Sequence, residues 1–317
     1  MSLLSLLIAL MAEKSLSSSV WCFDYYYQKY TVFFNDNTFL SKLENKNLSH
    51  ALFLIIPVAI VYGILAIVEN GLLNLIISTL ILIVSLGCFS TRNSYKQYLQ
   101  AAFKGEETTL TLCHKQLLQD KNIPDMGFGQ ALIWLNYRYY IAIMLFFIFF
   151  GAAGALFYRL LTTAIEKQNS VTLTTELMDK ENETQEVIQE EVIDSNVNDS
   201  PSREATDEVT ADEKPIICKD YQNILFYIDW IPVRITSFGY MLVGHFSKAF
   251  PTWLENLFDT QKPANEILID VAQKSEDIMV GDNDCTAEPC LLVRLAKRNV
   301  LLMLAFIAIL TLIGIVN

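Results

Sequence analysis

Four residues that can do chemistry lie in one short run, D-W-I-P-V-R, where an apolar segment begins in the second half of the chain. They are Asp229, Trp230, Pro232 and Arg234. A guanidinium here can hold an anionic ligand, and a neighbouring carboxylate can supply a fixed counter-charge. Ionisable residues inside a membrane segment are costly, so by default they indicate a functional site. The stretch 220–259 is therefore the first candidate for a working site.

Pro232 predicts where the helix of this stretch begins. Proline is well tolerated at the first helical position, because its missing N–H would be unpaired there. A start at Pro232 puts Asp229 just before the positive end of the helix dipole, where a carboxylate is stabilised. Along this helix, within the polar helical segment 224–250, one stripe holds Arg234, Phe238, Met241, His245 and Lys248. Such a stripe must face protein, water or headgroups, because exposing arginine to lipid is costly.

Two other segments add candidates. Tyr95 lies between Arg92 and Lys96 on one helix face, which can hold an anionic ligand or contact lipid headgroups. Asn136 and Arg138 precede a long apolar run, and an arginine there either binds a ligand or extends to the headgroups. The complete predicted ligand-binding set is Tyr95, Asn136, Arg138, Asp229, Trp230, Pro232, Arg234 and His245.

Motifs for enzymatic chemistry are missing from the sequence. It has no P-loop, GxSxG or HExxH, and its three histidines are isolated. Cys285 and Cys290 are the one close cysteine pair, and they lack the second pair that a zinc site needs, which leaves isolated thiols or one disulfide. We expect no catalytic residue, no metal and no cofactor. Enzymatic activity stays open, with a non-enzyme favoured.

The composition is that of an integral membrane protein. The chain of 317 residues is 52% hydrophobic, with a mean hydropathy of +0.32. Its net charge of −12 comes from residues 176–213, which hold 14 acidic and 2 basic residues. With the rest neutral and without a basic stripe, nucleic-acid binding is not expected. The polar segment 166–214 cannot bury enough apolar area to offset its ordering entropy, so we predict a disordered acidic linker.

Apolar runs divide the remainder into an all-α, polytopic membrane protein with four to five spanning helices. The N-terminal membrane half, 1–165, holds a short surface helix at 3–11 and a cytoplasmic helical loop at 91–138. The C-terminal membrane half, 215–317, holds the polar helix 224–250. The predicted spans lie near residues 50–68, 72–89, 140–161 and 299–316.

Basic residues predict the orientation. Lysines and arginines flank the hairpin of the first two spans and are missing from its turn, so the turn faces outward. Arg294 and its neighbours start the last span from the cytoplasm. If 140–161 crosses once, then 224–250 either returns as a fifth crossing, which we favour slightly, or lies in the interface. The five-crossing layout puts Arg159 and Lys167 outside, against the rule.

Three segments together resemble one family. They are ALIWLNYRYY before an apolar run, DWIPVR with GHFSKAFPTWL after it, and the basic residues before the last span. The chain resembles the AmpE-type inner-membrane proteins. The resemblance implies a multi-pass protein of the bacterial cytoplasmic membrane that senses or modulates signalling in β-lactamase induction, the β-lactam response and cell-wall recycling. Its implied partners are the lipid bilayer and an anionic envelope-derived ligand or a signalling protein.

A more distant similarity supplies the alternative function. W-I-P-V-R-I-T is similar to the P-A-R-L-T element of the membrane-bound cobinamide-phosphate synthases, and Pro232, Arg234 and Thr236 match it. This implies a membrane-embedded, amide-forming enzyme. Where those enzymes carry acidic pairs, this chain has Asn136-Tyr137-Arg138, which argues against amide synthesis.

Overall fold

Helices make up the secondary structure of the parts that the computed structural model describes, and no strand occurs in them. These parts are residues 2–15, 21–36, 46–87, 89–193, 216–276 and 287–314. The predicted all-α class is confirmed. The cysteine pair cannot be compared with its prediction, because Cys285 lies outside the described residues.

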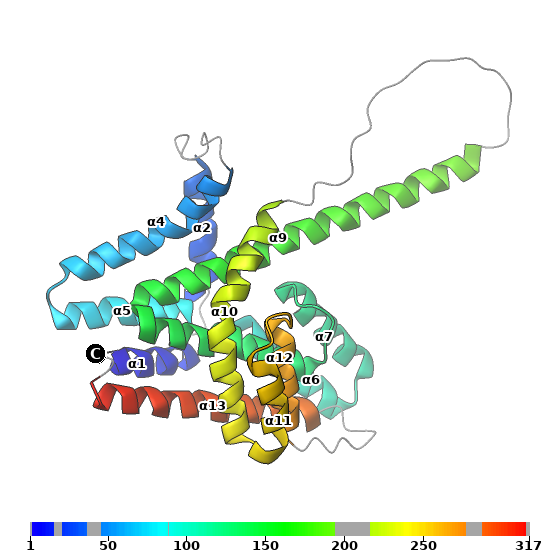
Figure 1. The fold of residues 1–317 in the computed structure, drawn as a ribbon. Coiled ribbons are helices and arrows are strands. Elements are labelled where there is room, and N and C mark those ends of the chain that lie inside the picture. Colours follow the sequence, from blue (N-terminus) through cyan, green and yellow to red (C-terminus); the bar gives the residue numbers. More distant parts are fainter. Residues whose placement is uncertain are drawn as a thin grey trace.

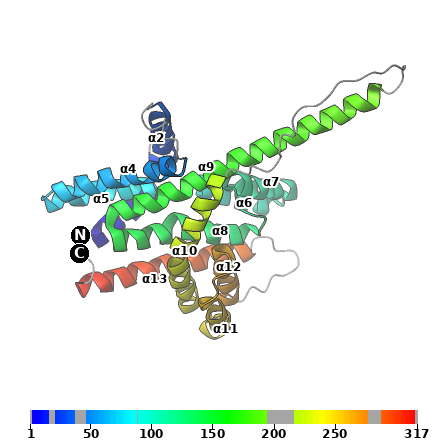
Figure 2. The ribbon, with the colours of Figure 1, turned by 45° about the horizontal axis from the view of Figure 1, so that its top comes forward.

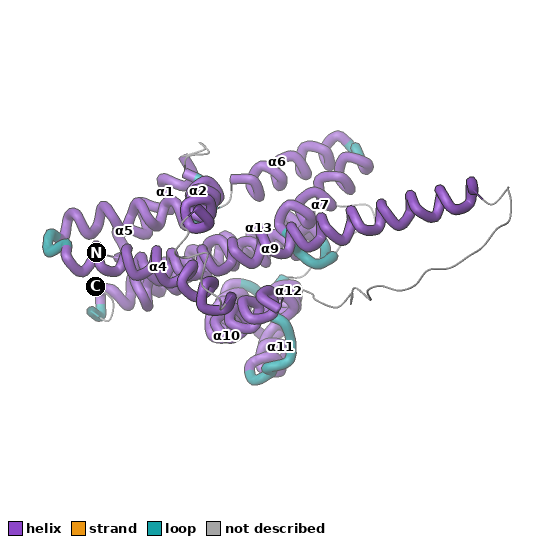
Figure 3. The backbone as a smooth tube through the Cα atoms, turned by 90° about the horizontal axis from the view of Figure 1, so that it is seen from above, coloured by secondary structure: helices purple, strands orange, loops and turns teal. Residues whose placement is uncertain are grey.

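The N-terminal helices gather at one end of the molecule, where both termini also lie (Figure 3). α1 (Ser2–Ser15) contains the helix predicted at 3–11 and packs on α5 (Gly71–Ser85). α4 (Lys46–Ile67) and α5 form the predicted hairpin (Figure 1). α2 (Phe23–Asp36) stands against α4, where the Tyr30 hydroxyl donates to the Phe53 carbonyl at 2.9 Å. Aromatic packing thus fixes α2 on the hairpin.

The predicted helical loop forms three helices at the other end of the molecule. α6 (Phe89–Lys104) and α7 (Glu107–Lys121) pack together, and α8 (Phe128–Asn136) follows a break that contains Pro124 and Gly127. α8 lies close to α13 (Ala287–Leu312), since a Cβ on Gly129 would come within 3.1 Å of the Pro289 backbone.

Residue Gly151 reverses the most apolar run of the chain. α8 continues through the π-helix η2 (Tyr137–Ile141) into α9 (Ala142–Ile193), but Gly151 has φ 68° and ψ −163°. The rings of Phe146 and Tyr158 lie 4.8 Å apart. Twelve residues of straight helix would separate them by about 18 Å. The run therefore folds back on itself as a tight hairpin (Figure 2), and the prediction of one straight span at 140–161 is wrong.

After the hairpin, α9 continues as a long helix that projects from the body (Figure 1). It reaches Ile193, so the predicted disorder is not confirmed for residues 166–193. The physical reason is that this acidic run has no proline or glycine to stop a helix that is already nucleated at Ala152. Residues 194–214 of the predicted linker lie outside the described residues.

α10 (Ile216–Val243) begins well before Pro232, so the predicted helix start is wrong. The side chains of Tyr221, Leu225, Asp229 and Val233 are buried at intervals of four residues, on one face. Burial of this face stabilises the helix on both sides of Pro232. The helix therefore continues past the proline, although the missing N–H costs one backbone hydrogen bond. Pro232 is itself buried, and its carbonyl accepts from the Thr236 hydroxyl at 2.7 Å.

The predicted helix 224–250 is also broken. α10 ends at Val243 and α11 (Phe246–Leu257) begins after His245, whose N–H donates to the Ser275 carbonyl at 2.7 Å. Gly244 permits this approach of α12 (Ala264–Ser275), because a Cβ there would come within 2.3 Å of the same carbonyl oxygen. The predicted stripe from Arg234 to Lys248 is therefore wrong, because its ends lie on two helices.

By length and composition, two helical runs of the described chain can cross a membrane: Phe128–Gln168 and Ala287–Leu312. Gly71–Ser85 and Ser90–Lys104, which meet at 44°, would make a third as one bent span. The apolar part of α4, Ala51–Ile67, is shorter. Four to five spans are thus not confirmed, and α10 is not among the candidates.

Candidate functional site

A π-helix stands at the centre of the molecule's polar interactions. The hydrogen bonds of a π-helix span one residue more than those of an α-helix, and such single turns are frequent at functional sites. In η2 it carries three tyrosines whose hydroxyls donate to three carboxylates on different helices. The pairs are Tyr137 with Asp229 on α10 at 2.7 Å, Tyr139 with Glu166 on α9 at 2.8 Å, and Tyr140 with Glu13 on α1 at 2.9 Å. We call these six residues the tyrosine–carboxylate cluster.

The Asp229 pair is the most buried of the three. The Tyr158 hydroxyl donates to the same oxygen, Oδ1, at 2.9 Å, and Asp229 is 2% exposed. Asp229 lies outside the helices that are apolar enough to cross a membrane. Burial raises the pKa of its carboxyl, whereas the Arg138 guanidinium and the two phenols oppose that rise. Asp229 thus ties α10 to both limbs of the Gly151 hairpin.

Arg138 supplies the positive charge beside this carboxylate. Its charge interacts with Asp229, and its guanidinium lies 4.7 Å from the centre of the Trp134 ring. Its Nε is buried and has no hydrogen-bond partner within the described part of the chain. The residue predicted as an anion contact and the one predicted as its counter-charge are therefore brought together.

The second pair is surrounded by cations. Arg159, 3% exposed, lies with its guanidinium 4.3 Å from the centre of the Tyr139 ring, and the Lys121 ammonium lies 4.9 Å from the same centre. Glu166 accepts from the Tyr139 hydroxyl. α7 and both limbs of the hairpin thus meet at one aromatic ring.

The third pair anchors the N-terminal helix. Besides Tyr140, Arg92 of α6 contacts Glu13, with its Nη2 3.1 Å from Oε1 and donating to the Glu13 carbonyl at 3.1 Å. Gly87 lets the carboxylate approach, since a Cβ there would come within 2.2 Å of it. α1, α6 and η2 are therefore linked through one carboxylate.

The guanidinium of Arg234, also on α10, makes a separate set of contacts. Its N–H groups donate to backbone carbonyls. It donates to Trp230 at 3.1 Å, to Leu257 at 3.3 Å and to Asn256 at 3.4 Å, and also to the Asp259 carbonyl. The last three close the C-terminus of α11, where a cation is favoured by the helix dipole. Arg234 thus fixes α11 on α10.

Comparison with known proteins decides the family. The family model described as "Regulatory signalling modulator protein AmpE" matches residues 1–183 and 216–317. The chain belongs to the AmpE family. A relative named "Protein AmpE" from Shigella flexneri is 33% identical over 91 residues, which are 29% of this chain and 32% of that relative. No solved structure matches.

Membership confirms the predicted AmpE resemblance, and the family description names a regulatory signalling modulator. In the described part of the chain, two helical runs are long and apolar enough to cross a membrane. The AmpE match omits residues 184–215, within the acidic segment. The similarity to cobinamide-phosphate synthases is not addressed by these comparisons and stays a prediction.

The remaining predicted residues of this AmpE protein are spread over three places. Trp230 lies beside Arg234, with its ring centre 4.7 Å from the guanidinium carbon. Trp230 Nε1 and Asn136 Oδ1 are buried without a hydrogen-bond partner in the described structure. The Tyr95 hydroxyl lies 3.8 Å from Cys290 Sγ on α13, and the His245 side chain is exposed before α11. The structure thus gathers Arg138 with Asp229, and Trp230 with Arg234.

Sequence reasoning missed most of the tyrosine–carboxylate cluster. Glu166 fell in the predicted linker, and Glu13 lies just beyond the surface helix predicted at 3–11. Tyr158, which donates to the cluster's Asp229, fell in the predicted span 140–161. The available signal was the dense tyrosine run Y-R-Y-Y at an apolar boundary. Within the described residues, no three His, Cys, Asp or Glu side chains lie together where they could hold a metal.

Proposed function

We propose that this AmpE protein is a multi-pass protein of the bacterial cytoplasmic membrane that modulates β-lactamase induction in response to β-lactams and cell-wall recycling. The family description supports the regulatory part. The observation that supports a signalling mechanism is the convergence of Asp229, Glu166 and Glu13 on one π-helix. α10, α9 and α1 each place a carboxylate on this one π-helix. A shift of one of these helices therefore changes the hydrogen bonds of the others.

The proposed input is an anionic envelope-derived ligand or a signalling protein that meets Arg138. Such an anion would compete with Asp229 for the guanidinium, whose Nε has no partner in the described structure. Trp230 Nε1 and Asn136 Oδ1 are further buried groups that a ligand would satisfy. Loss of the Arg138–Asp229 attraction would loosen α10 from the hairpin.

The Gly151 hairpin also supports a membrane topology. If residues 128–150 leave the cytoplasm and 152–168 return, Lys167 lies inside, as the positive-inside rule prefers. The acidic segment is then cytoplasmic, and Arg294 starts the last crossing from inside without any crossing by α10. The earlier conflict over Lys167 disappears, because it lies at the cytoplasmic end of the returning limb. Arg159 lies inside that limb, where its side chain is buried.

Reporter fusions test this topology. A green fluorescent protein inserted within residues 194–214 is expected to fluoresce, and alkaline phosphatase fused after Asn317 is expected to be active. Phosphatase inserted beside Glu69, in the turn of the α4–α5 hairpin, is the external control. Phosphatase activity from the insertion within 194–214 would contradict the returning limb and restore the fifth crossing.

Removal of the three phenols of η2 tests the signalling role. A strain that lacks its own copy is complemented with the wild-type protein or with the triple variant Tyr137→Phe, Tyr139→Phe, Tyr140→Phe. We expect β-lactamase induction by a β-lactam to change at least about five-fold, since each lost hydrogen bond to a charged acceptor is worth about 1.5 kcal/mol or more. Tyr227→Phe, which is 77% exposed on α10, is the matched control. Unchanged induction at equal membrane levels would refute the proposal.

No observation in the described structure favours the amide-forming alternative. Arg234 and Thr236 match the P-A-R-L-T element of the cobinamide-phosphate synthases, but both donate to backbone carbonyls of α10. Arg234 donates to Trp230, and the Thr236 hydroxyl donates to Pro232. We therefore do not propose it as a second function.

A further inference from the structure

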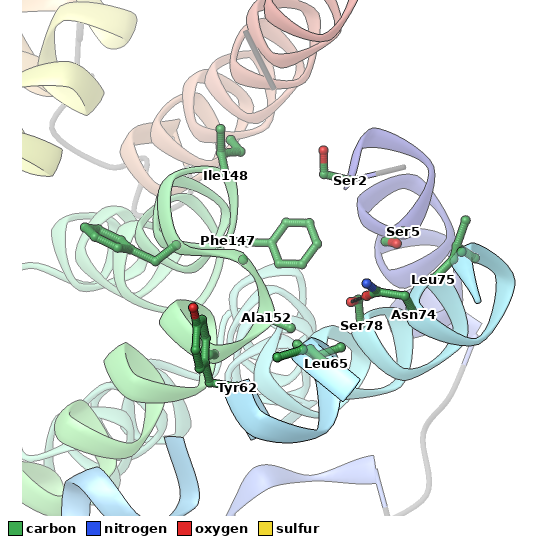
Figure 4. A pocket seen from close by; sticks show the side chains of 15 residues that line it. Ser2, Ser5, Tyr62, Leu65, Asn74, Leu75, Ser78, Phe147, Ile148 and Ala152 are labelled. Atoms are coloured by element: carbon green, nitrogen blue, oxygen red, sulfur yellow. Dashed lines mark hydrogen bonds between the residues drawn. The ribbon is translucent and has the colours of Figure 1, made fainter. Parts of the chain in front are cut away.

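A cavity of about 690 Å³ lies at the turn of the Gly151 hairpin (Figure 4). It is lined by the start of α1, the turn of the α4–α5 hairpin and the turn of the Gly151 hairpin. We call it the hairpin cavity. Its volume is within the range of about 300–1,000 Å³ that is usual for small-molecule sites. The sequence reasoning contained no sign of it, because it forms only when α9 folds back.

The two sides of the hairpin cavity differ in chemistry. Ser2, Ser5, Asn74 and Ser78 are on the side of α1 and α5, and the Ser78 hydroxyl donates to Asn74 Oδ1 at 3.2 Å. On the side of α9, the Phe147 ring points across the cavity toward them (Figure 4). Ile148 and Phe150 extend this apolar side, and none of the lining residues is charged. The cavity therefore fits a molecule with one uncharged polar end and one apolar end.

Asn74 gives the hairpin cavity its main hydrogen-bonding group. α5 has the sequence GLLNLIISTLILIVS, in which an amide side chain stands among apolar ones. In a helix, positions 74 and 78 lie one turn apart on the same face. An unpaired amide is costly in lipid. The orientation of both side chains into the hairpin cavity removes that cost and gives the cavity a hydrogen-bonding end.

The surface around the cavity indicates how a ligand would reach it. Large apolar side chains are exposed on α1, α4 and α5, among them Leu7, Ile8, Ile64, Ile67, Leu72 and Ile76. Exposed apolar surface of this extent is typical of contact with acyl chains. A molecule that enters from this side enters from the bilayer. The occupant must therefore be soluble in lipid.

We propose that the hairpin cavity binds an uncharged amphiphile, a lipid whose headgroup carries hydroxyls. Its alkyl part would pack on Phe147 and Ile148, and its hydroxyls would hydrogen-bond with Asn74 and the serines. A charged headgroup would be buried without a counter-ion, which is strongly unfavourable. This site lies beyond the proposed anion contact at Arg138 and takes a ligand of a different class.

Photo-cross-linking tests the proposal. The purified full-length protein is placed in phosphatidylcholine vesicles with a trace of diacylglycerol that carries a diazirine in one acyl chain. A phosphatidic acid probe with the same chains differs by its charged headgroup. The diacylglycerol is expected to label peptides with residues 62–78 and 147–153 at least about five-fold more than phosphatidic acid does. Its hydroxyl gains a hydrogen bond in the cavity, whereas the phosphate of phosphatidic acid would be buried without a counter-ion.

Variants separate a site from bulk lipid. Asn74→Leu should reduce diacylglycerol labelling of these peptides about five-fold, whereas Asn223→Leu, exposed on α10, should not change it. If Asn74→Leu does not fold, Ser78→Ala is the milder variant, with a smaller loss in the same direction. Equal labelling by both probes, or labelling unchanged in the folded variant, would show that acyl chains of the bulk bilayer fill the cavity. Because the readout is binding in vesicles, a failure here is distinguishable from a failure of β-lactamase modulation.

Discussion

Replacement of Asp229 by alanine is expected to lower the free energy of unfolding by about 3 kcal/mol, because it leaves a partly buried guanidinium without its counter-charge. It also leaves the hydroxyls of Tyr137 and Tyr158 buried without their acceptor. Asp229→Asn keeps an acceptor oxygen for the phenols but not the charge, so a loss between those of wild type and alanine is expected. The order of the three proteins separates charge from hydrogen bonding.

Denaturation in detergent, followed by the near-ultraviolet signal of the tyrosines and tryptophans, measures these differences. Asp120→Ala is the matched control, because Asp120 is exposed on α7 and its loss should change the unfolding free energy by less than about 0.5 kcal/mol. In cells, the same proteins are compared for β-lactamase induction. An Asp229→Ala protein as stable as the Asp120→Ala protein, with normal induction, would remove the cluster from both fold and function.

The helical class was predictable from local pattern. Buried positions recur every four residues in α10, and the boundaries at Pro124 and Gly127 are strong helix signals. The types of Arg138 and Asp229 suggested opposite charges at one site, and the structure brings them together. Such inferences succeed because they depend on residue type and short spacing.

Pairings across the chain were not predictable in this way. Tyr140 and Glu13 are separated by 127 positions and Tyr137 and Asp229 by 92, and no local pattern links them. Arg234 illustrates a second reason. An arginine in an apolar segment has the same sequence pattern whether it binds an anion or caps the end of another helix. Here its guanidinium donates to backbone carbonyls of α11.

The reversal at Gly151 is the clearest case of a feature hidden by composition. The run around it is continuously apolar, and G-A-A-G reads as a surface for close helix packing. No proline, polar turn or charge interrupts it. What decides the conformation is the contact of the two limbs, such as that of Phe146 with Tyr158, and this contact exists only after the chain has turned.

Substitution of Gly151 by alanine is therefore expected to destabilise the protein by about 2 kcal/mol, because its φ and ψ fall in a region essentially confined to glycine. The effect is conformational and not steric, since nothing lies within 4 Å of the added Cβ. Gly63→Ala is the matched control. It also adds a Cβ with nothing within 4 Å, but in the interior of α4, where alanine is favoured over glycine by about 0.5–1 kcal/mol.

The two substitutions should therefore act with opposite signs in the same denaturation experiment. A disulfide between cysteines placed at Phe146 and Tyr158, whose rings are 4.8 Å apart, reports the hairpin directly. It should form in the wild-type background and in Gly63→Ala, and form more slowly in Gly151→Ala, because that protein closes the two limbs less often. Equal stability of the two alanine variants, with no disulfide formed in any of the three backgrounds, would mean that residues 142–168 form one straight helix, and the single span at 140–161 would then stand.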